Sequence, residues 1–140
     1  MSTPMELAII TSSYPRYSGD GVGSFIHSLS KSLIHLGHHV TVLAPYDPAD
    51  VENWQTTVDV RRVRFVWPES WSHLGHAQSL ESDVRLKWHA YPLVALFSMF
   101  ATIELLRVIH HEKPDVIYAQ WLVPGGFIGA IASVLTGTPL

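Results

Sequence analysis

The residues best suited to chemistry lie in a glycine-containing loop near the start of this 140-residue chain. The loop follows a polar stretch, opens a segment with helical periodicity, and contains Gly21, Val22, Gly23 and Ser24. Glycines let a backbone approach a ligand closely, and free N–H groups at a helix start attract anions. The pattern predicts a phosphate or diphosphate site, where a bulky side chain at position 23 would block the ligand but spare the fold. A purely connecting role for these glycines is the alternative that the sequence leaves open.

The loop does not match the common nucleotide-binding motifs. The chain has no Gly-Lys-Ser/Thr sequence, so the loop is not a P-loop. Gly19 and Gly21 begin like a nicotinamide fingerprint, but Ser24 stands where its third glycine belongs. No acidic residue closes the next apolar run, which ends at Leu43-Ala44-Pro45. A P-loop NTPase is therefore excluded, and a dinucleotide-dependent dehydrogenase is a poor match.

Composition and charge remove further classes of protein. Without cysteine, the chain has no disulfides, cysteine nucleophile or Cys-ligated metal. Its formal net charge of −3 does not suit a protein that neutralises nucleic-acid phosphates. Among its nine histidines, the adjacent pairs His38-His39 and His110-His111 would point in different directions, and His73 and His76 lie in unassigned sequence. We therefore expect no metal ion, no cofactor and no nucleic-acid partner.

Hydrophobic periodicity predicts the elements that must position the loop. Strands are expected at Met5–Thr11, His39–Ala44, Val58–Val66 and Asp115–Ala119. Helices are expected at Val22–Leu36, at Tyr91–His111 and from Pro124 to Leu135. This order is typical of right-handed βαβ units. We predict an α/β fold: a Rossmann-like, open, mostly parallel sheet with helices on both faces.

The segment Val58–Val66 is predicted to lie at the sheet edge, because neither of its faces is apolar throughout. Its Arg61, Arg62 and Arg64 divide between the two faces, which favours solvated side chains over a membrane-binding patch. The segment Asp47–Thr57 reads as a surface loop. No structure is assigned to Trp67–Lys87.

The most apolar segment, Ala90–Ile103, is shorter than the roughly 20 residues that a membrane span needs. Pro92 interrupts its start, and Glu104 and Arg107 follow directly. A buried helix is predicted, and a helix in the membrane interface is the alternative. The apolar stripe of this helix is expected to run through Leu96, Phe100, Ile103, Leu106 and Ile109. The N-terminus has no positively charged region before an apolar stretch, so no secretory signal is predicted.

Three segments of the chain match a known pattern when taken together. They are Gly19-Asp20-Gly21-Val22-Gly23-Ser24-Phe25-Ile26-His27, then Leu36-Gly37-His38-His39-Val40-Thr41-Val42-Leu43-Ala44-Pro45, then Lys113-Pro114-Asp115-Val116-Ile117-Tyr118-Ala119-Gln120-Trp121 with Pro124-x-Gly126. This combination resembles the opening of family-4 glycosyltransferases with the GT-B fold. Thr136–Leu140 resembles the lead-in to their next strand, whereas Asp47–Lys87 is weakly covered. Tyr118 and Gln120 stand where many relatives carry histidines, so no histidine-based role is implied.

The resemblance implies that residues 1–140 are a partial N-terminal, acceptor-side domain, with the C-terminal donor domain absent. It implies a retaining transfer of a hexosyl or similar sugar from a nucleotide-sugar donor to a glycan, lipid or small-molecule acceptor, without a metal. The donor diphosphate would lie against Gly21, Val22, Gly23 and Ser24. Tyr14, Arg16, Gln120 and Trp121 are the candidates for contacts with the acceptor.

Further expectations follow for the chain by itself. Such a portion is expected to be inactive alone, because departure of the leaving group needs residues on both sides of a cleft. Uncovered apolar helices would favour self-association. A cytoplasmic location, with peripheral contact to the inner face of a membrane, is also expected. The alternative function is a non-catalytic Rossmann-like module that binds a ligand or another protein.

Overall fold

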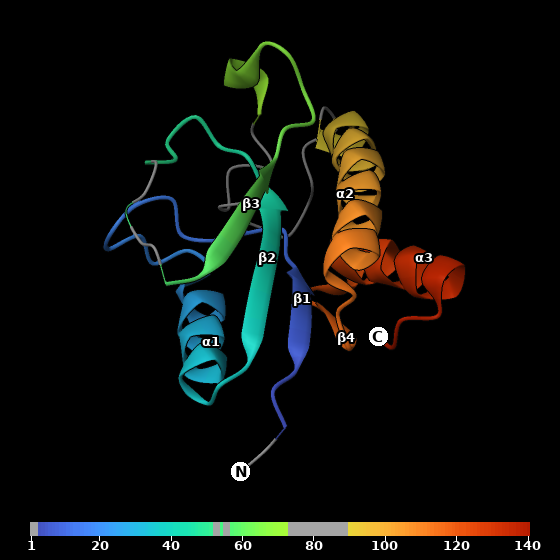
Figure 1. Cartoon of the computed structure of the whole chain (residues 1–140). Helices are drawn as coiled ribbons and strands as arrows, with labels where there is room; N and C mark the ends of the chain where they lie inside the picture. Colours follow the sequence, from blue (N-terminus) through green and yellow to red (C-terminus); the bar gives the residue numbers. More distant parts are fainter. Residues whose placement is uncertain (1–2, 52–53, 55–56, 73–89) are drawn as a thin grey trace.

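The computed structural model of the chain describes residues 3–51, 54, 57–72 and 90–140. Four parallel strands form one sheet in the order β3-β2-β1-β4 (Figure 1). The strands are β1 (Glu6–Ile10), β2 (His39–Pro45), β3 (Asp59–Val63) and β4 (Val116–Ala119). The predicted parallel α/β fold is confirmed. Strand β3 lies at an edge of this sheet, as its mixed polarity predicts.

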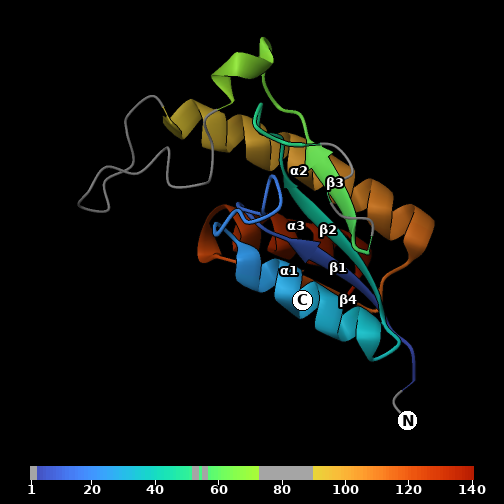
Figure 2. The ribbon, with the colours of Figure 1, turned by 90° about the vertical axis from the view of Figure 1, so that its left-hand side faces the viewer.

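Three α-helices among the described residues cover the two faces of the sheet. Helix α1 (Ser24–His35) lies on one face, and α2 (Ala90–Glu112) and α3 (Phe127–Thr136) lie on the other (Figure 2). Alternate residues of β1 serve the two sides: Ile9 packs in the α1 layer, and Ala8 and Ile10 pack in the α2–α3 layer. Strand β1 is therefore apolar on both faces, which is why it reads as a continuous hydrophobic run.

The helix boundaries and buried faces differ in detail from the predictions. In α2 the fully buried stripe is Phe97, Ala101, Leu105 and Val108. Of the predicted stripe, Ile109 is buried, whereas Leu96, Phe100 and Ile103 are exposed. This helix is apolar around most of its circumference, so its sequence does not specify which side faces the sheet. Likewise α1 buries Ile26 and Ser30 while Phe25 is exposed.

The prediction that Pro124 begins the last helix is wrong. Pro124 lies in η2 (Leu122–Gly126), a π-helical turn, and α3 begins only at Phe127. The Gly126 N–H donates to the Trp121 carbonyl at 2.8 Å and closes this turn. Val123 inside the turn has extended rather than helical dihedral angles, so the backbone bends before Pro124, whereas Gly126 and Phe127 at the junction with α3 have helical angles.

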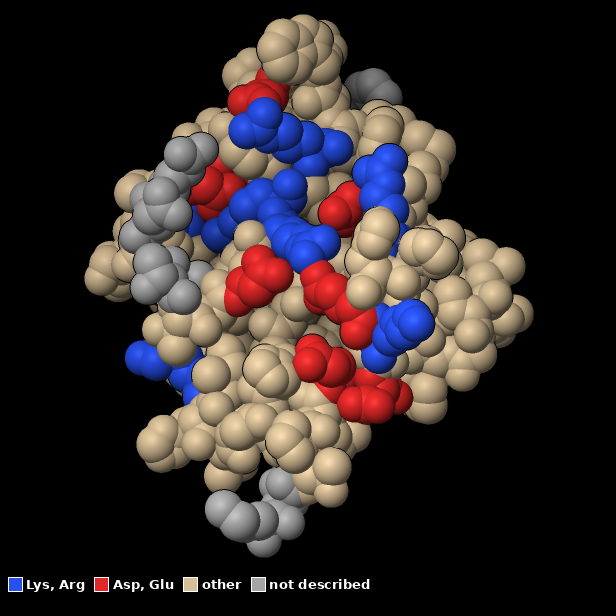
Figure 3. Space-filling model, viewed as in Figure 1, with Lys and Arg blue, Asp and Glu red and all other residues tan. Residues whose placement is uncertain are grey.

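Helices α2 and α3 leave an apolar surface uncovered. By length and composition α2 could cross a membrane, and only 28% of its most apolar window is buried in the fold. A groove of about 670 Å³ runs between the two helices, lined by side chains that include Met99, Ile103 and Phe127. The face of the molecule in Figure 3 carries few charged side chains on the side formed by these helices.

This apolar surface is expected to make the 140-residue chain self-associate. Exposed patches of this kind are covered in stable proteins, because leaving them in water costs free energy in proportion to their area. Light scattering over a concentration series should show mass rising with concentration. Ile103→Lys, on the exposed face of α2, should reduce that rise, whereas Lys31→Gln on α1 should not. A monodisperse monomer at high concentration would contradict the expectation.

Candidate functional site

The candidate site lies where β1 and β4 end side by side. The Gln120 N–H, directly after β4, donates to the Ile10 carbonyl at the end of β1 at 2.8 Å. The loop after β1 leads to α1 on one face of the sheet, and the loop after β4 leads to α3 on the other (Figure 1). In open parallel sheets, ligands bind where successive connections diverge to opposite faces. The structure therefore brings the glycine-containing loop and the loop that carries Gln120 and Trp121 to the position that the fold favours for a ligand.

The glycine-containing loop ends at the N-terminus of α1, as predicted. No side chain among the described residues caps this helix, and its first turn holds no acidic residue. Gly21 and Ser24 are exposed, Val22 is half-buried and Gly23 is buried. The helix start is therefore open on the side of Gly21 and Ser24, and the positive end of its dipole favours an anion there.

Gly23 has a structural reason to be glycine. It adopts a left-handed conformation with φ of 70° as the N-cap residue of α1. A Cβ added at this position would lie 2.7 Å from the Ser13 carbonyl oxygen and 3.0 Å from the Tyr14 Cα. The expectation that a side chain at position 23 would spare the fold is therefore wrong. At Gly21 an added Cβ would meet nothing within 4 Å.

Tyr14, one of the acceptor candidates, is completely buried. Its hydroxyl lies 2.7 Å from Nδ1 of His27 on α1, and burial raises the pKa of the phenol. The centre of the His27 ring in turn lies 5.0 Å from the centre of the nearer Trp54 ring, and burial of His27 lowers the pKa of its imidazole. The Tyr14 ring leaves no face open for stacking on a sugar, so the structure gives it a packing role instead.

Arg16, the second acceptor candidate of this loop, is held by carboxylates. Its Nε donates to Asp20 Oδ2 at 2.7 Å, and its Nη1 lies 3.7 Å from Asp47 Oδ2. All three side chains are largely buried, although Asp47 had been placed in a surface loop by its sequence. The Arg16 guanidinium therefore stabilises the loop in this structure.

Asp20 links that ion pair to the start of α1. Its Oδ2 also accepts the Arg16 N–H, and its Oδ1 accepts the Val22 N–H at 3.2 Å. Burial raises the pKa of Asp20, but these hydrogen bonds from Arg16 and Val22 outweigh it and bring the pKa to about 2. The carboxylate is thus charged throughout the physiological range.

Acid is expected to remove the stabilisation that the charged Asp20 carboxylate gives to the fold. The folded pKa of Asp20 lies below its ordinary value of 3.8, so the charged form stabilises the fold fully above about pH 4 and loses this effect as the pH falls toward 2. The shift corresponds to about 2 kcal/mol of unfolding free energy. Urea unfolding of the chain and of Asp20→Asn should differ at pH 6 and converge as the pH approaches 2. A pH-independent difference would show that the ionised carboxylate is not responsible.

The second loop places Gln120 and Trp121 at the same edge of the sheet. The Tyr118 hydroxyl donates to Gln120 Oε1 at 2.9 Å, which fixes the side-chain amide. Trp121 has a positive φ of 69° and an exposed indole. A left-handed backbone at a bulky residue is strained and is typical of functional loops. Both residues therefore remain candidates for acceptor contacts.

Arg62 differs from the prediction. A solvated arginine was expected, but the Arg62 side chain is largely buried and its Nη2 lies 2.9 Å from Asp50 Oδ1. Arg61 and Arg64 also have acidic partners, in Glu112 and Glu69. Figure 3 accordingly shows Lys and Arg side chains along the β3 side with Asp and Glu side chains beside them. The acidic residues after β2 were the signal that could have revealed this pairing.

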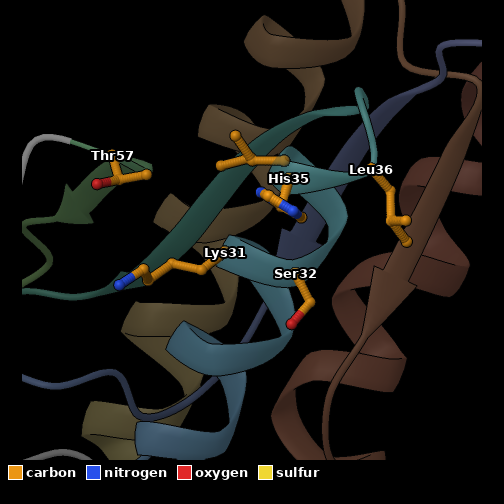
Figure 4. A pocket seen from close by; sticks show the side chains of 6 residues that line it. Lys31, Ser32, His35, Leu36 and Thr57 are labelled. Atoms are coloured by element: carbon orange, nitrogen blue, oxygen red, sulfur yellow. The ribbon is translucent and has the colours of Figure 1, made fainter.

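The possible metal ligands and a hollow at the far end of α1 do not contribute to the candidate site. Among the described residues, no three His, Asp or Glu side chains are grouped so that they could hold a metal ion, and His73 and His76 lie outside those residues. A hollow of about 540 Å³ lies at the C-terminal end of α1. It is lined by Lys31, Ser32, Ile34, His35 and Leu36 from α1 and its end, and by Thr57 (Figure 4). This end of α1 is opposite to the end that adjoins Gly21–Ser24.

Comparison with known proteins identifies the family. No curated protein matches the chain. The model of the glycosyl transferase 4-like domain matches residues 20–140, from the glycine-containing loop through α3 and beyond. The match covers most of the chain and includes Gly21–Ser24 at the end of the first loop and the whole loop after β4. The chain therefore belongs to the glycosyl transferase 4-like family.

Proposed function

We propose that this chain is the acceptor-side portion of a retaining glycosyltransferase that uses a nucleotide-sugar donor. Membership of the family supports sugar transfer in general. The observation that supports the finer assignment is the meeting of two loops where β1 and β4 end, beside a helix N-terminus that no described side chain caps. Gly21 and Ser24 are exposed there.

The proposed chemistry follows from the groups at this edge of the sheet. Departure of a nucleoside diphosphate builds negative charge on its phosphates, and fixed N–H groups at the start of α1 stabilise such charge without reorganising. On the other loop, the Gln120 amide and the Trp121 indole are suited to sugar hydroxyls and to the apolar face of a sugar ring. These groups bind and orient the substrates. Residues on a second side of the cleft would complete the transfer.

Nucleotide binding tests the proposal directly. UDP and GDP, added to the 15N-labelled chain, should shift the amide resonances of residues 21–24 and 120–121. Gly21→Val should weaken binding by about tenfold or more, because its side chain would occupy the approach of the phosphates. It should not change the melting temperature, since an added Cβ there contacts nothing within 4 Å. Ser28→Ala, on the exposed side of α1, is the matched control.

The 140-residue preparation should turn over neither UDP-sugars nor GDP-sugars, because residues 1–140 are proposed to form one side of the cleft. Turnover above that of the heat-treated chain would contradict the inactivity of the chain alone. Shifts that are absent, or that are equally strong in Gly21→Val, would contradict a donor site in this loop. Shifts confined to residues far from both loops would do the same.

A further inference from the structure

The edge strand β3 sends one side chain to the glycine-containing loop. Arg62 Nη2 donates to the Pro15 carbonyl at 2.6 Å, and its Nη1 donates to the Tyr14 carbonyl at 3.5 Å. Its guanidinium carbon lies 5.4 Å from the centre of the Tyr14 ring. The Arg62 side chain is 17% exposed and pairs with Asp50. A nearly buried cation thus donates hydrogen bonds to two consecutive carbonyl groups of the loop that connects β1 to α1.

The contacts continue from Pro15 to the start of α1. Arg16 is the next residue, and it pairs with Asp20, which accepts the Val22 N–H. The Val51 N–H, from the segment after β2, donates to the Arg16 carbonyl at 2.8 Å. The loop is therefore anchored in its first part by Arg62, in its middle by the segment after β2, and at its end by Asp20.

Arginine is suited to this position because of its shape. Its planar guanidinium presents several N–H donors in a fixed fork, so it can contact a carboxylate and two carbonyl oxygens together. A lysine ammonium at the same place could pair with Asp50 but could not reproduce the fork. The cost of burying the cation is offset by its ion pair with Asp50 and by its hydrogen bonds to the Pro15 and Tyr14 carbonyls.

We propose that Arg62 is a positioning residue that orders the loop from Tyr14 to Val22 and thereby fixes the backbone of Gly21–Ser24 for an anionic ligand. The step to a donor diphosphate rests on the function proposed above, whereas the ordering of the loop does not. Arg62 itself touches the loop and has no assigned contact with a substrate.

Hydrogen exchange and nucleotide binding of three variants test this role. Arg62→Gln should raise the exchange rates of amides in residues 14–23 by about tenfold or more, with β1 and β2 little changed, and weaken UDP binding similarly. Arg62→Lys keeps a cation beside Asp50, so it should recover the melting temperature but not the loop protection. Arg64→Gln is the control, because Arg64 is exposed and contacts Glu69 and Tyr46 rather than the loop.

The outcomes separate this inference from the proposed function. Unchanged amide exchange of the loop in Arg62→Gln would overturn the proposed role of Arg62. Full recovery of loop protection in Arg62→Lys would also overturn it, because Arg62 would then act only as a counter-charge for Asp50. If Arg62→Gln does not fold, loop exchange in Arg62→Lys decides. If the unmodified chain binds no UDP, the donor site fails while the exchange comparison still decides whether Arg62 orders the loop.

Discussion

Gly125→Ala is expected to destabilise the chain by about 3 kcal/mol, near the upper end of the usual cost of overpacking. An added Cβ would lie 2.3 Å from the Gln120 carbonyl oxygen and 3.4 Å from the Ile10 carbonyl oxygen. Both are backbone atoms beside the hydrogen bond that joins the ends of β4 and β1. Relief of the contact would therefore separate the two strand ends or move the turn that precedes α3. Urea unfolding measures the loss.

Gly126→Ala is the matched control for this prediction. Gly126 has helical dihedral angles, and an added Cβ would meet its nearest neighbours at ordinary distances of 3.5 and 3.6 Å. Alanine there should be neutral, or stabilising by about 0.5 kcal/mol, because it restricts the unfolded chain. Equal stability of the two variants would show that the close approach at Gly125 is not a real constraint.

Gly23→Ala is expected to cost about 2–4 kcal/mol, from a left-handed backbone and a contact too close to relax. The residue has φ of 70°, and its new Cβ would face the Ser13 carbonyl oxygen at 2.7 Å. Thermal and urea unfolding should both detect the loss. Gly21→Ala, two residues earlier, has neither feature and should melt like the unmodified chain.

A Gly23→Ala variant as stable as Gly21→Ala would contradict this explanation and restore position 23 as a clean test of ligand binding. If Gly23→Ala is destabilised as predicted, a loss of ligand binding in any position-23 variant could come from the disturbed fold and not only from a blocked binding site. Gly21 is then the position at which the phosphate hypothesis can be tested without disturbing the protein.

The order of strands and helices was predictable from local sequence patterns. Strands buried on both faces require continuous apolar runs, and the crossover from β1 through α1 to β2 has the length and glycine positions of a βαβ unit. The glycine-containing loop could likewise be placed before a helix, because the hydrophobic period changes after it. The family was also recognisable, since its short motifs lie in these same segments.

Other features depended on contacts between residues far apart in the chain. The buried face of α2 could not be read from a helix that is apolar on nearly every side. The pairing of Arg62 with Asp50 and with the Tyr14 and Pro15 carbonyls joins segments whose relative position only the sheet order establishes.

The sequence by itself determined the fold class, the edge position of β3 and the two loops that form the candidate site. These depend on local periodicity and on glycine and proline positions, which act over a few residues. Only the tertiary structure decided that Tyr14 is buried, that Arg16 and Arg62 hold the loop, and that Gly23 and Gly125 are required by backbone contacts. The physical reason is that burial, ion pairing and close backbone approach are properties of neighbours in space, and parallel strands bring those neighbours from distant parts of the chain.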